Sequence, residues 1–529
     1  MGDPARPAEL PAALAEAYRQ GAREFTITPG TYRLPATGRE SIALRGWSDA
    51  AIHAKDVTVI FEETEHRPVL LQGCANVSIE GATLQFAGIS FTQGRIKAIG
   101  KDGDGAYCDW QIDAGYPTNI DPVKSTYNVI DRQTRLLKVG TGDCGVKAVE
   151  QLGPGLFRLR QMYGLFAGLA VDDWLVTRAP GGSSIVQLAD CKQCTMKDIT
   201  LKNSGFAAFF ETDGDGGHRY LGCRVTRGPK PAGASEEQLV SCGADGFHSV
   251  GTRAGPTFDH CTWDGVLLDD CIAIHGSFQK VLRADGPRLI LEKGNRGHFA
   301  VNEPVRISSA GGYFGQAKCV ALRDLASPES GLELTLDSAL PVPPDAKAAN
   351  PQRCGQGFKI LHCTLGNTRS RGILVKADHG TIQDCLIEGC GMSAVSIGPE
   401  YWWNEGDYCW HVTVSRNTFR HNNLNGGDAS TVLVHGDGAI GNRDILVCNN
   451  HFEENYGFFT MNLAYTDGLK ITGNVIDRPC PRPLPRPGHI FNLTASRNIL
   501  LKNNAVSSPG PSLGSRVNLG KGVEGLTDE

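Results

Sequence analysis

The chain has 529 residues, with 65 glycines and 28 prolines, and its 52 basic and 57 acidic side chains give a net charge of −5. This balance, with no Lys/Arg cluster interleaved with aromatic residues, argues against nucleic acid as a partner. The sequence has no run of about 18 apolar residues, which excludes a membrane-spanning helix of ordinary length. The high glycine and proline content favours turn-rich β structure.

The N-terminal residues lack the apolar core of a secretory signal. We expect that a leader has been removed and that the protein is secreted or periplasmic rather than cytoplasmic. Residues 7–21 then carry apolar side chains on one side, which predicts a short helix that caps the open end of a solenoid. Short strands separated by turns follow, at residues 24–27, 57–61 and 76–84.

A pattern of strand, polar bend and strand recurs along the rest of the chain. From Cys363 onward the bends recur every ~22–33 residues, a period typical of solenoids. Side chains alternate inward and outward along each strand, and Asn at a bend tolerates left-handed backbone and can stack on the Asn of the next coil. The fold class that we predict is all-β, a right-handed parallel β-helix.

Two segments, residues 92–179 and 279–356, break this rhythm and are predicted to be small antiparallel β modules inserted between coils. The second begins directly after His275, so we expect it to wall the functional site. The predicted organisation is an N-terminal cap with the first coils (1–91), the first module (92–179), coils that carry the acidic site (180–278), a barrel-like second module (279–356), C-terminal coils (357–510) and a tail (511–529).

The seventeen cysteines do not predict a disulfide framework, because the chain is long and the count is odd. Cys191 and Cys194 have zinc-like spacing but no second pair or His nearby, so packing is the preferred interpretation. Four other cysteines share one setting, just before a strand-like run, which predicts an internal ladder of thiols that pack as small hydrophobes: Cys223, Cys261, Cys363 and Cys385.

Three aspartates form the most informative motif. Asp245 lies in Gly-Ala-Asp-Gly-Phe-His, and Asp269 and Asp270 open the run Asp-Asp-Cys-Ile-Ala-Ile-His-Gly about two dozen residues later, near one solenoid turn. Rungs of a parallel β-coil lie about 4.8 Å apart, so the three carboxylates are expected to lie side by side. Such crowding separates their pKa values, and glycoside hydrolysis needs one protonated and one ionised carboxyl group.

The alternative is a pair of surface turn aspartates, which is less favoured because an apolar strand follows Asp270 directly. Consecutive residues on a regular strand point to opposite faces. Asp269 and Asp270 can therefore share a site only if the backbone bends between them.

Several other polar residues are candidates for substrate binding. Glu211 lies one or two rungs earlier and could add an acidic wall, or belong to a solvated turn or a loose calcium loop. Arg371 and Lys376, on an alternating strand, could hold sugar hydroxyls and keep the aspartates ionised, or form a solvated face. His248 and His275 flank the aspartates and could donate to a hydroxyl, or be buried histidines with satisfied hydrogen bonds.

Three successive aromatic residues at 401–403 stand out for a loop. Trp402 and Trp403 are predicted to meet the flat apolar face of a sugar ring, the alternative being an apolar plug beneath a loop. The neighbouring Glu405 and Glu400 could bind sugar hydroxyls.

Asp245-Gly246 followed by residues 269–274 resembles the polygalacturonase clan of inverting β-helix glycosidases. The departures are specific. Polygalacturonases have Asn-Thr-Asp where this chain has Gly-Ala-Asp, no Gly-His-Gly occurs here, and the segment from Arg371 to Lys376 is only a stretched likeness of their Arg-Ile-Lys.

The overall plan is more similar to the α-1,3-galactosidases of glycoside hydrolase family 110. Residues 269–276, 371–375 and 402–406 match that family's signatures in order, and the resemblance covers roughly residues 185–480. It implies an inverting exo-glycosidase that removes terminal α-linked galactose, in an α-1,3 linkage, from oligosaccharides or glycans, with no metal or organic cofactor. It also implies that Asp269 is the general acid and that Asp245 and Asp270 direct the attacking water.

Three other functions remain open at this point. One is another β-helix glycoside hydrolase, polygalacturonase-like or acting on dextran-like polymers, and Arg371 and Lys376 keep an acidic sugar open. Another is a polysaccharide lyase or epimerase; lyases on this fold usually recruit calcium and a Lys or Arg base. The third is a binding or adhesive solenoid. The expected partner is an oligosaccharide or glycan, with no nucleic acid and no membrane, and homo-oligomerisation stays open.

Overall fold

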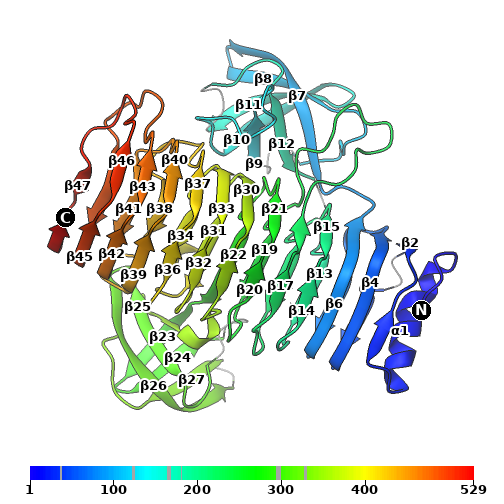
Figure 1. Ribbon diagram of the computed structural model, residues 1–529, viewed down its shortest axis with the longest axis horizontal. Coiled ribbons are helices and arrows are strands. Elements are labelled where there is room, and N and C mark those ends of the chain that lie inside the picture. Colours follow the sequence, from blue (N-terminus) through cyan, green and yellow to red (C-terminus); the bar gives the residue numbers. More distant parts are fainter. Residues whose placement is uncertain (36–37, 122–125, 164–167, 180, 294–298, 327–329) are drawn as a thin grey trace.

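The computed structural model describes residues 1–529 except 36–37, 122–125, 164–167, 180, 294–298 and 327–329. The chain winds into a long parallel β-helix that begins under a short 3-10 helix η1 (Pro7–Glu9) and helix α1 (Leu10–Arg19) (Figure 1). Leu10 and Leu14 of α1 are buried against the first coils, so the helix closes the apolar end of the solenoid. The predicted fold class is confirmed.

Each complete coil contributes three short strands. One lies in a sheet of β3 (Glu40–Arg45), β5 (Arg67–Gln72), β13 (Val186–Ala189), β16 (Phe209–Thr212), β19 (Phe247–Val250), β22 (Ile272–Ser277), β31 (Ile373–Lys376), β34 (Val395–Ile397), β38 (Ser430–Val434), β41 (Phe459–Ala464), β44 (His489–Thr494) and β47 (Val517–Leu519). We call this sheet the site sheet. Its strands pair in parallel along the whole solenoid.

The other two strands of each coil lie in a second long sheet, in which a bend separates them. Its strands are β1 (Glu24–Thr26), β2 (Gly30–Leu34), β4 (Ser48–Phe61), β6 (Ala75–Phe86), β14 (Thr195–Lys197), β15 (Thr200–Lys202), β17 (Arg219–Leu221), β18 (Arg224–Val225), β20 (Thr257–Asp259), β21 (Thr262–Asp264), β29 (Lys359–Leu361), β30 (Thr364–Thr368), β32 (Thr381–Gln383), β33 (Leu386–Cys390), β36 (Thr413–Ser415), β37 (Thr418–Arg420), β39 (Asn442–Cys448), β40 (His451–Glu453), β42 (Thr466–Thr472), β43 (Val475–Asp477), β45 (Arg497–Lys502), β46 (Ala505–Ser507) and β48 (Glu524–Asp528).

The bends use the left-handed backbone region, which short polar side chains tolerate best. His260, Asp384 and Asn449 have φ values of 55°, 54° and 55° between successive strands of this second sheet. Inside the solenoid, residues at matching positions stack on one another. The amide of Asn450 donates to Asn474 Oδ1 at 3.0 Å, and Asn474 donates to Asn504 Oδ1 at 2.8 Å.

The cysteines pack as the sequence predicts. Cys223, Cys261, Cys363 and Cys385 occupy matching positions on successive rungs, and all seventeen cysteines are free, sixteen of them buried. Cys191 and Cys194 are buried beside the solenoid core.

Two closed antiparallel barrels interrupt the coils and project to opposite sides of the solenoid in Figure 1. The first comprises β7 (Phe91–Asp102), β8 (Gly105–Ile112), β9 (Thr126–Ile130), β10 (Cys144–Gly153), β11 (Leu156–Tyr163) and β12 (Trp174–Arg178). The second comprises β23 (Gln279–Asp285), β24 (Arg288–Glu292), β25 (Pro304–Ser309), β26 (Gly312–Leu325), β27 (Gly331–Leu336) and β28 (Lys347–Ala349).

The barrels attach to the solenoid in different ways. The apolar cluster of the first barrel includes Leu239 and Val240, and Leu267 and Leu268, from the solenoid segments that precede the aspartates. The second barrel inserts Arg306, which is 2% exposed and is bonded to two solenoid carboxylates. The first barrel therefore rests on the chain segments that position the acidic site.

Candidate active site

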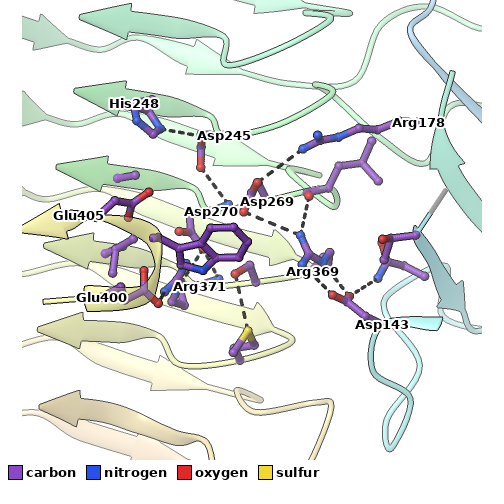
Figure 2. Close-up of a pocket in the computed structure, with 18 of the residues that line it drawn as sticks. Asp143, Arg178, Asp245, His248, Asp269, Asp270, Arg369, Arg371, Glu400 and Glu405 are labelled. Carbon is purple, nitrogen blue, oxygen red and sulfur yellow. Dashed lines mark hydrogen bonds and ion pairs between the residues drawn. The ribbon is translucent and has the colours of Figure 1, made fainter. Parts of the chain in front are cut away.

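A cavity of about 730 Å³ lies on the outer face of the site sheet, between the first barrel and the turn that carries the two tryptophans. This volume lies within the usual range for small-molecule sites. Its lining combines carboxylates, guanidinium groups and aromatic rings: Asp143, Arg178, Asp245, His248, Asp269, Asp270, Arg369, Arg371, Glu400, Trp402, Trp403 and Glu405. Figure 2 shows the charged residues of this set together with His248.

Register brings Asp245, Asp270 and Arg371 together. Strands β19, β22 and β31 pair in parallel with Phe247 opposite Ile272 and Ile272 opposite Ile373. The residues two places before each of these are therefore neighbours on successive rungs. The backbone N–H of Asp270 donates to Asp245 Oδ1 at 3.2 Å, and the backbone N–H of Arg371 donates to Asp270 Oδ1 at 2.8 Å.

Asp269 joins the other two because residues 267–271 form a turn and a bend rather than a strand. The sequence required such a bend if consecutive aspartates were to share one site. Carboxylate oxygens of Asp245, Asp269 and Asp270 all lie within 4.8 Å of one another. The side chain of Asp269 is 34% exposed, whereas those of Asp245 and Asp270 are 8% and 2% exposed.

The three carboxyl groups therefore differ in environment. Enclosure by the protein raises the pKa of Asp269 to about 7; the charges of Asp245 and Asp270 add to this shift, and Arg369 and Arg178 oppose it. At neutral pH Asp269 thus retains a proton for part of the time, beside two carboxylates that already accept hydrogen bonds. A group that can donate a proton next to groups that can accept one is the arrangement that acid–base catalysis needs.

The two histidines form a pair whose protonation follows from geometry. Burial lowers the pKa of His275 to about 3, and its Nδ1 lies 2.7 Å from the carbonyl oxygen of Gly276, which can only accept. His275 Nε2 is therefore an acceptor, and His248 Nε2, 3.0 Å away, is the donor. Burial acts to lower the pKa of His248, but the hydrogen bond to Asp245 at 2.9 Å and the charge of Asp245 raise it. His248 faces the cavity, whereas His275 lies behind it.

The cations predicted to hold sugar hydroxyls are already paired. Arg371 Nε donates to Asp270 at 3.0 Å and its Nη1 donates to Glu400 at 2.6 Å. Lys376 is fully buried beneath the cavity floor, where it bonds Glu400 at 2.9 Å and Glu405 at 2.6 Å. Burial opposes ionisation of Glu405, yet the ion pair with Lys376 helps to lower its pKa to about 2. Glu405 and Glu400 therefore face the cavity as anions.

The turn that carries the aromatic residues is the 3-10 helix η3 (Tyr401–Trp403), followed by β35 (Glu405–Gly406), which pairs with β22. Trp402 and Trp403 are 63% and 68% exposed and line the cavity, so an apolar plug beneath a loop does not describe them. Tyr401 holds the turn in place, because its hydroxyl donates to two carbonyl oxygens of the second barrel, at 3.1 and 2.9 Å.

Three expectations about position are wrong. Glu211 is 1% exposed and points into the solenoid, where Tyr220 and Ser249 donate to its carboxylate at 2.9 and 2.8 Å, and burial raises its pKa. It therefore adds no acidic wall to the cavity. Lys376 and His275 support the floor and do not line it.

The third error concerns the wall itself, because none of the described residues of the second barrel lines the cavity. The first barrel forms the wall instead, through residues that sequence reasoning missed: Thr126, Asn128, Asp143 and Arg178. Local sequence offered no signal for them, since they lie about 70–140 residues before the aspartates. Arg369 also lines the cavity, two residues before the predicted Arg371.

Two groups of side chains in the described part of the chain could hold a cation. The first is the aspartate trio, whose oxygens suit a hard cation such as Ca²⁺ or Mg²⁺. The second is Asp259, His260 and His362, which lie at bends of the second sheet and are partly or fully exposed. No helix in the described ranges is long and apolar enough to cross a membrane.

The fold defines the class: this is an all-β protein of the parallel β-helix type with a polar cavity on its site sheet. Residues 352–510 match the family model described as "Right handed beta helix region". Alpha-1,3-galactosidase B of Bacteroides thetaiotaomicron is 24% identical over 198 residues, which are 35% of this chain and 32% of that protein. The match thus spans about a third of that relative.

Two solved structures align with most of this chain. The catalytic domain of a GH87 α-1,3-glucanase in complex with nigerose aligns with a TM-score of 0.46 and 11% identity, over 97% of this chain and 66% of that chain. The family 28 exopolygalacturonase of Yersinia enterocolitica aligns with a TM-score of 0.44 and 9% identity, over 97% of this chain and 74% of that chain.

Proposed function

We propose that the protein is a glycoside hydrolase that removes terminal α-linked galactose from oligosaccharides or glycans, in an α-1,3 linkage. The observation that carries this proposal is the convergence of three carboxyl groups in one cavity, one of which has its pKa raised to about 7. Hydrolysis of a glycosidic bond needs an acid to protonate the leaving oxygen and a carboxylate to activate water. The distant likeness to a protein named alpha-1,3-galactosidase B supports the choice of sugar and linkage.

In this proposal Asp269 is the general acid, and Asp245 and Asp270 orient the attacking water. Asp269 is the most exposed of the three and has the raised pKa. Asp245 is fixed by His248 and Asp270 by Arg371, so both are held as acceptors. This environment favours a proton donor at Asp269 beside two carboxyl groups that accept hydrogen bonds.

The charge of the cavity supports a neutral sugar over a uronic acid. The ion pairs of Arg371 and Lys376 with Glu400 and Glu405 consume the cations that could otherwise bind a sugar carboxylate. A uronate placed against Glu400 and Glu405 would lose hydration and gain no counterion from Arg371 or Lys376, which are already paired. Trp402 and Trp403 offer exposed rings for the apolar face of a sugar.

Inversion is proposed from the family resemblance rather than from the spacing of the carboxyl groups. Inverting glycosidases usually separate the two carboxyl groups by roughly 6.5–9.5 Å. The oxygens here lie within 4.8 Å of one another, which is closer. Stereochemistry must therefore be measured.

The test is a screen with nitrophenyl glycosides and α-galactosyl oligosaccharides, followed by proton NMR of the first sugar released. We expect cleavage of a terminal α-1,3-galactoside with initial release of β-galactose. Initial release of α-galactose would contradict inversion, and failure to cleave any α-galactoside while another glycoside is cleaved would contradict the sugar assignment.

A second candidate, a polysaccharide lyase, is favoured by one observation: the aspartate trio could hold Ca²⁺, with Arg178 and Arg369 nearby as cationic side chains. A lyase would lose activity in EDTA and release an unsaturated product that absorbs in the ultraviolet. The hydrolase proposed here yields a saturated sugar.

A further inference from the structure

The first barrel places one carboxylate behind the residue assigned as the acid. Asp143 immediately precedes β10, and it binds Arg369 through two parallel hydrogen bonds, both of 2.7 Å, from Nε and Nη2 (Figure 2). Asn128 of β9 donates to the same carboxylate at 3.0 Å. Paired hydrogen bonds of this kind fix both the position and the plane of a guanidinium group.

Arg369 in turn lies against the turn that carries Asp269. Its Nη1 donates to the carbonyl oxygen of Leu268 at 2.9 Å and lies 3.8 Å from Asp269 Oδ1. Leu268 and the preceding Leu267 are buried in the apolar cluster of the first barrel. The first barrel is thus joined to the backbone at Asp269 in two ways, by the apolar packing of Leu267 and Leu268 and by the contacts of Asp143 with Arg369 and of Arg369 with Leu268.

The charges around Asp269 come from five segments of the chain. Asp245 and His248 lie before and on β19, and Asp270 precedes β22. Arg178, which ends β12, approaches Asp269 Oδ2 at 3.5 Å, and the Asp143–Arg369 pair lies on the far side. Arg369 favours the Asp269 anion, and the negative charge of Asp143 in its ion pair with Arg369 opposes that effect.

We infer that Asp143 is a positioning residue, supplied by the inserted barrel, which fixes Arg369 and thereby sets the upper pH limit at which Asp269 can act as the acid. The inference rests on the proposed function for its consequence in catalysis. In physical terms, the opposing charges of Arg369 and Asp143 act together on the Asp269 carboxyl group. The first barrel therefore does more than form one wall of the cavity, because it also supplies a charge next to the groups that surround Asp269.

The test is Asp143→Asn, which keeps the shape of the side chain but removes its charge and one of the two acceptors. The freed guanidinium would then stabilise the Asp269 anion. The alkaline limb of kcat/KM is expected to move to lower pH by roughly half a unit or more, with activity on the acid side within about threefold of wild type. A purely structural role would lower activity by the same factor at every pH.

Asp109→Asn is the matched control. Asp109 binds Arg158 by the same two-bond geometry, at 2.7 and 2.9 Å, in the same barrel but outside the cavity lining. Its loss is expected to leave the pH profile in place. A shift as large as that of Asp143→Asn would overturn the inference.

Arg369→Met is expected to shift the alkaline limb of kcat/KM in the opposite direction. It tests the same contact if Asp143→Asn fails to fold. Removal of the positive charge is expected to move the alkaline limb to higher pH. The double variant tests whether Asp143 acts through Arg369, because Asp143→Asn should then shift the alkaline limb less when Arg369 is absent. An equal shift in both backgrounds would show that Asp143 does not act through Arg369.

A titration separates this inference from the proposed function. Aspartate labelled with ¹³C at the carboxyl carbon can be followed by NMR against pH, with the Asp269 signal assigned by its loss in Asp269→Asn. The apparent pKa of Asp269 should be lower in Asp143→Asn than in wild type, whatever substrate the enzyme takes. An unchanged pKa overturns the inference, whereas turnover retained in Asp269→Asn would overturn the catalytic assignment instead.

Discussion

Asp269 differs from the other two aspartates in the partners of its carboxyl group. Asp245 and Asp270 each accept hydrogen bonds from a backbone N–H and pair with a side chain, His248 and Arg371 respectively, whereas the described residues give Asp269 only the looser approaches of Arg178 and Arg369, at 3.5 and 3.8 Å. Enclosure by the protein and, after it, two neighbouring negative charges raise the pKa of Asp269 and favour its protonated form. The division of roles among identical residues follows from environment rather than from sequence.

This difference predicts the pH dependence of the reaction. A general acid works in its protonated form, so a pKa raised to about 7 means that kcat/KM should hold below pH 7 and fall as the pH rises through that value. Asp269→Asn should lower turnover of a sugar-linked galactoside by about 10²–10⁴-fold and remove the alkaline limb. The loss should be smaller for a nitrophenyl galactoside, because nitrophenolate leaves without a proton. Equal losses on both substrates would contradict the assignment of Asp269 as the acid.

At the scale of elements, the sequence predicted the strands better than their contacts. The bends, the thiol ladder of Cys261 and its neighbours, and the capping helix all follow from local pattern and period. The inward orientation of the Glu211 side chain did not follow from local pattern, because the alternation of side chains along β16 allows either face. Its inward orientation depends on Tyr220 and Ser249, which come from other parts of the coil.

One of the contacts that join the second barrel to the solenoid is a buried cation, Arg306, and this predicts a stability effect. Arg306 Nη2 donates to Asp378 at 2.6 Å and its Nη1 donates to Asp407 at 3.2 Å. Arg306→Met would leave two buried carboxylates unpaired, at a cost of about 3–5 kcal/mol. We expect a clear fall in melting temperature.

Arg323→Met is the matched control, because its pair with Glu333 on the same barrel is exposed at Arg323 and worth at most about 1 kcal/mol. Equal effects of the two changes would contradict this account.

At the scale of the whole molecule, the solenoid brings distant residues to one cavity by a fixed rise per coil. That geometry made the aspartate trio predictable, since Asp245 and Asp270 are one rung apart. The wall was not predictable, because the side on which an inserted barrel packs depends on tertiary contacts such as those of Leu267 and Leu268. Local sequence shows between which coils a barrel is inserted. It does not show which surface of the solenoid the barrel packs against.

The two inserted barrels support different parts of the cavity lining. The second barrel anchors Tyr401, and the first barrel supplies Asp143, so each insertion supports one side of the site. The secreted or periplasmic location stays a prediction from the sequence.

The central claim is that three carboxyl groups, brought together by successive coils, act on one glycosidic bond. It is tested most directly by kcat on a terminal α-1,3-galactosyl oligosaccharide for three separate variants, Asp245→Asn, Asp269→Asn and Asp270→Asn, with sugar binding checked for each. Asp384→Asn, which breaks a surface pair with Arg416 at 2.9 Å on the second sheet, is the control. The account predicts a fall of about 10²-fold or more in each of the three and a wild-type rate in the control. A wild-type rate in any of the three would contradict it.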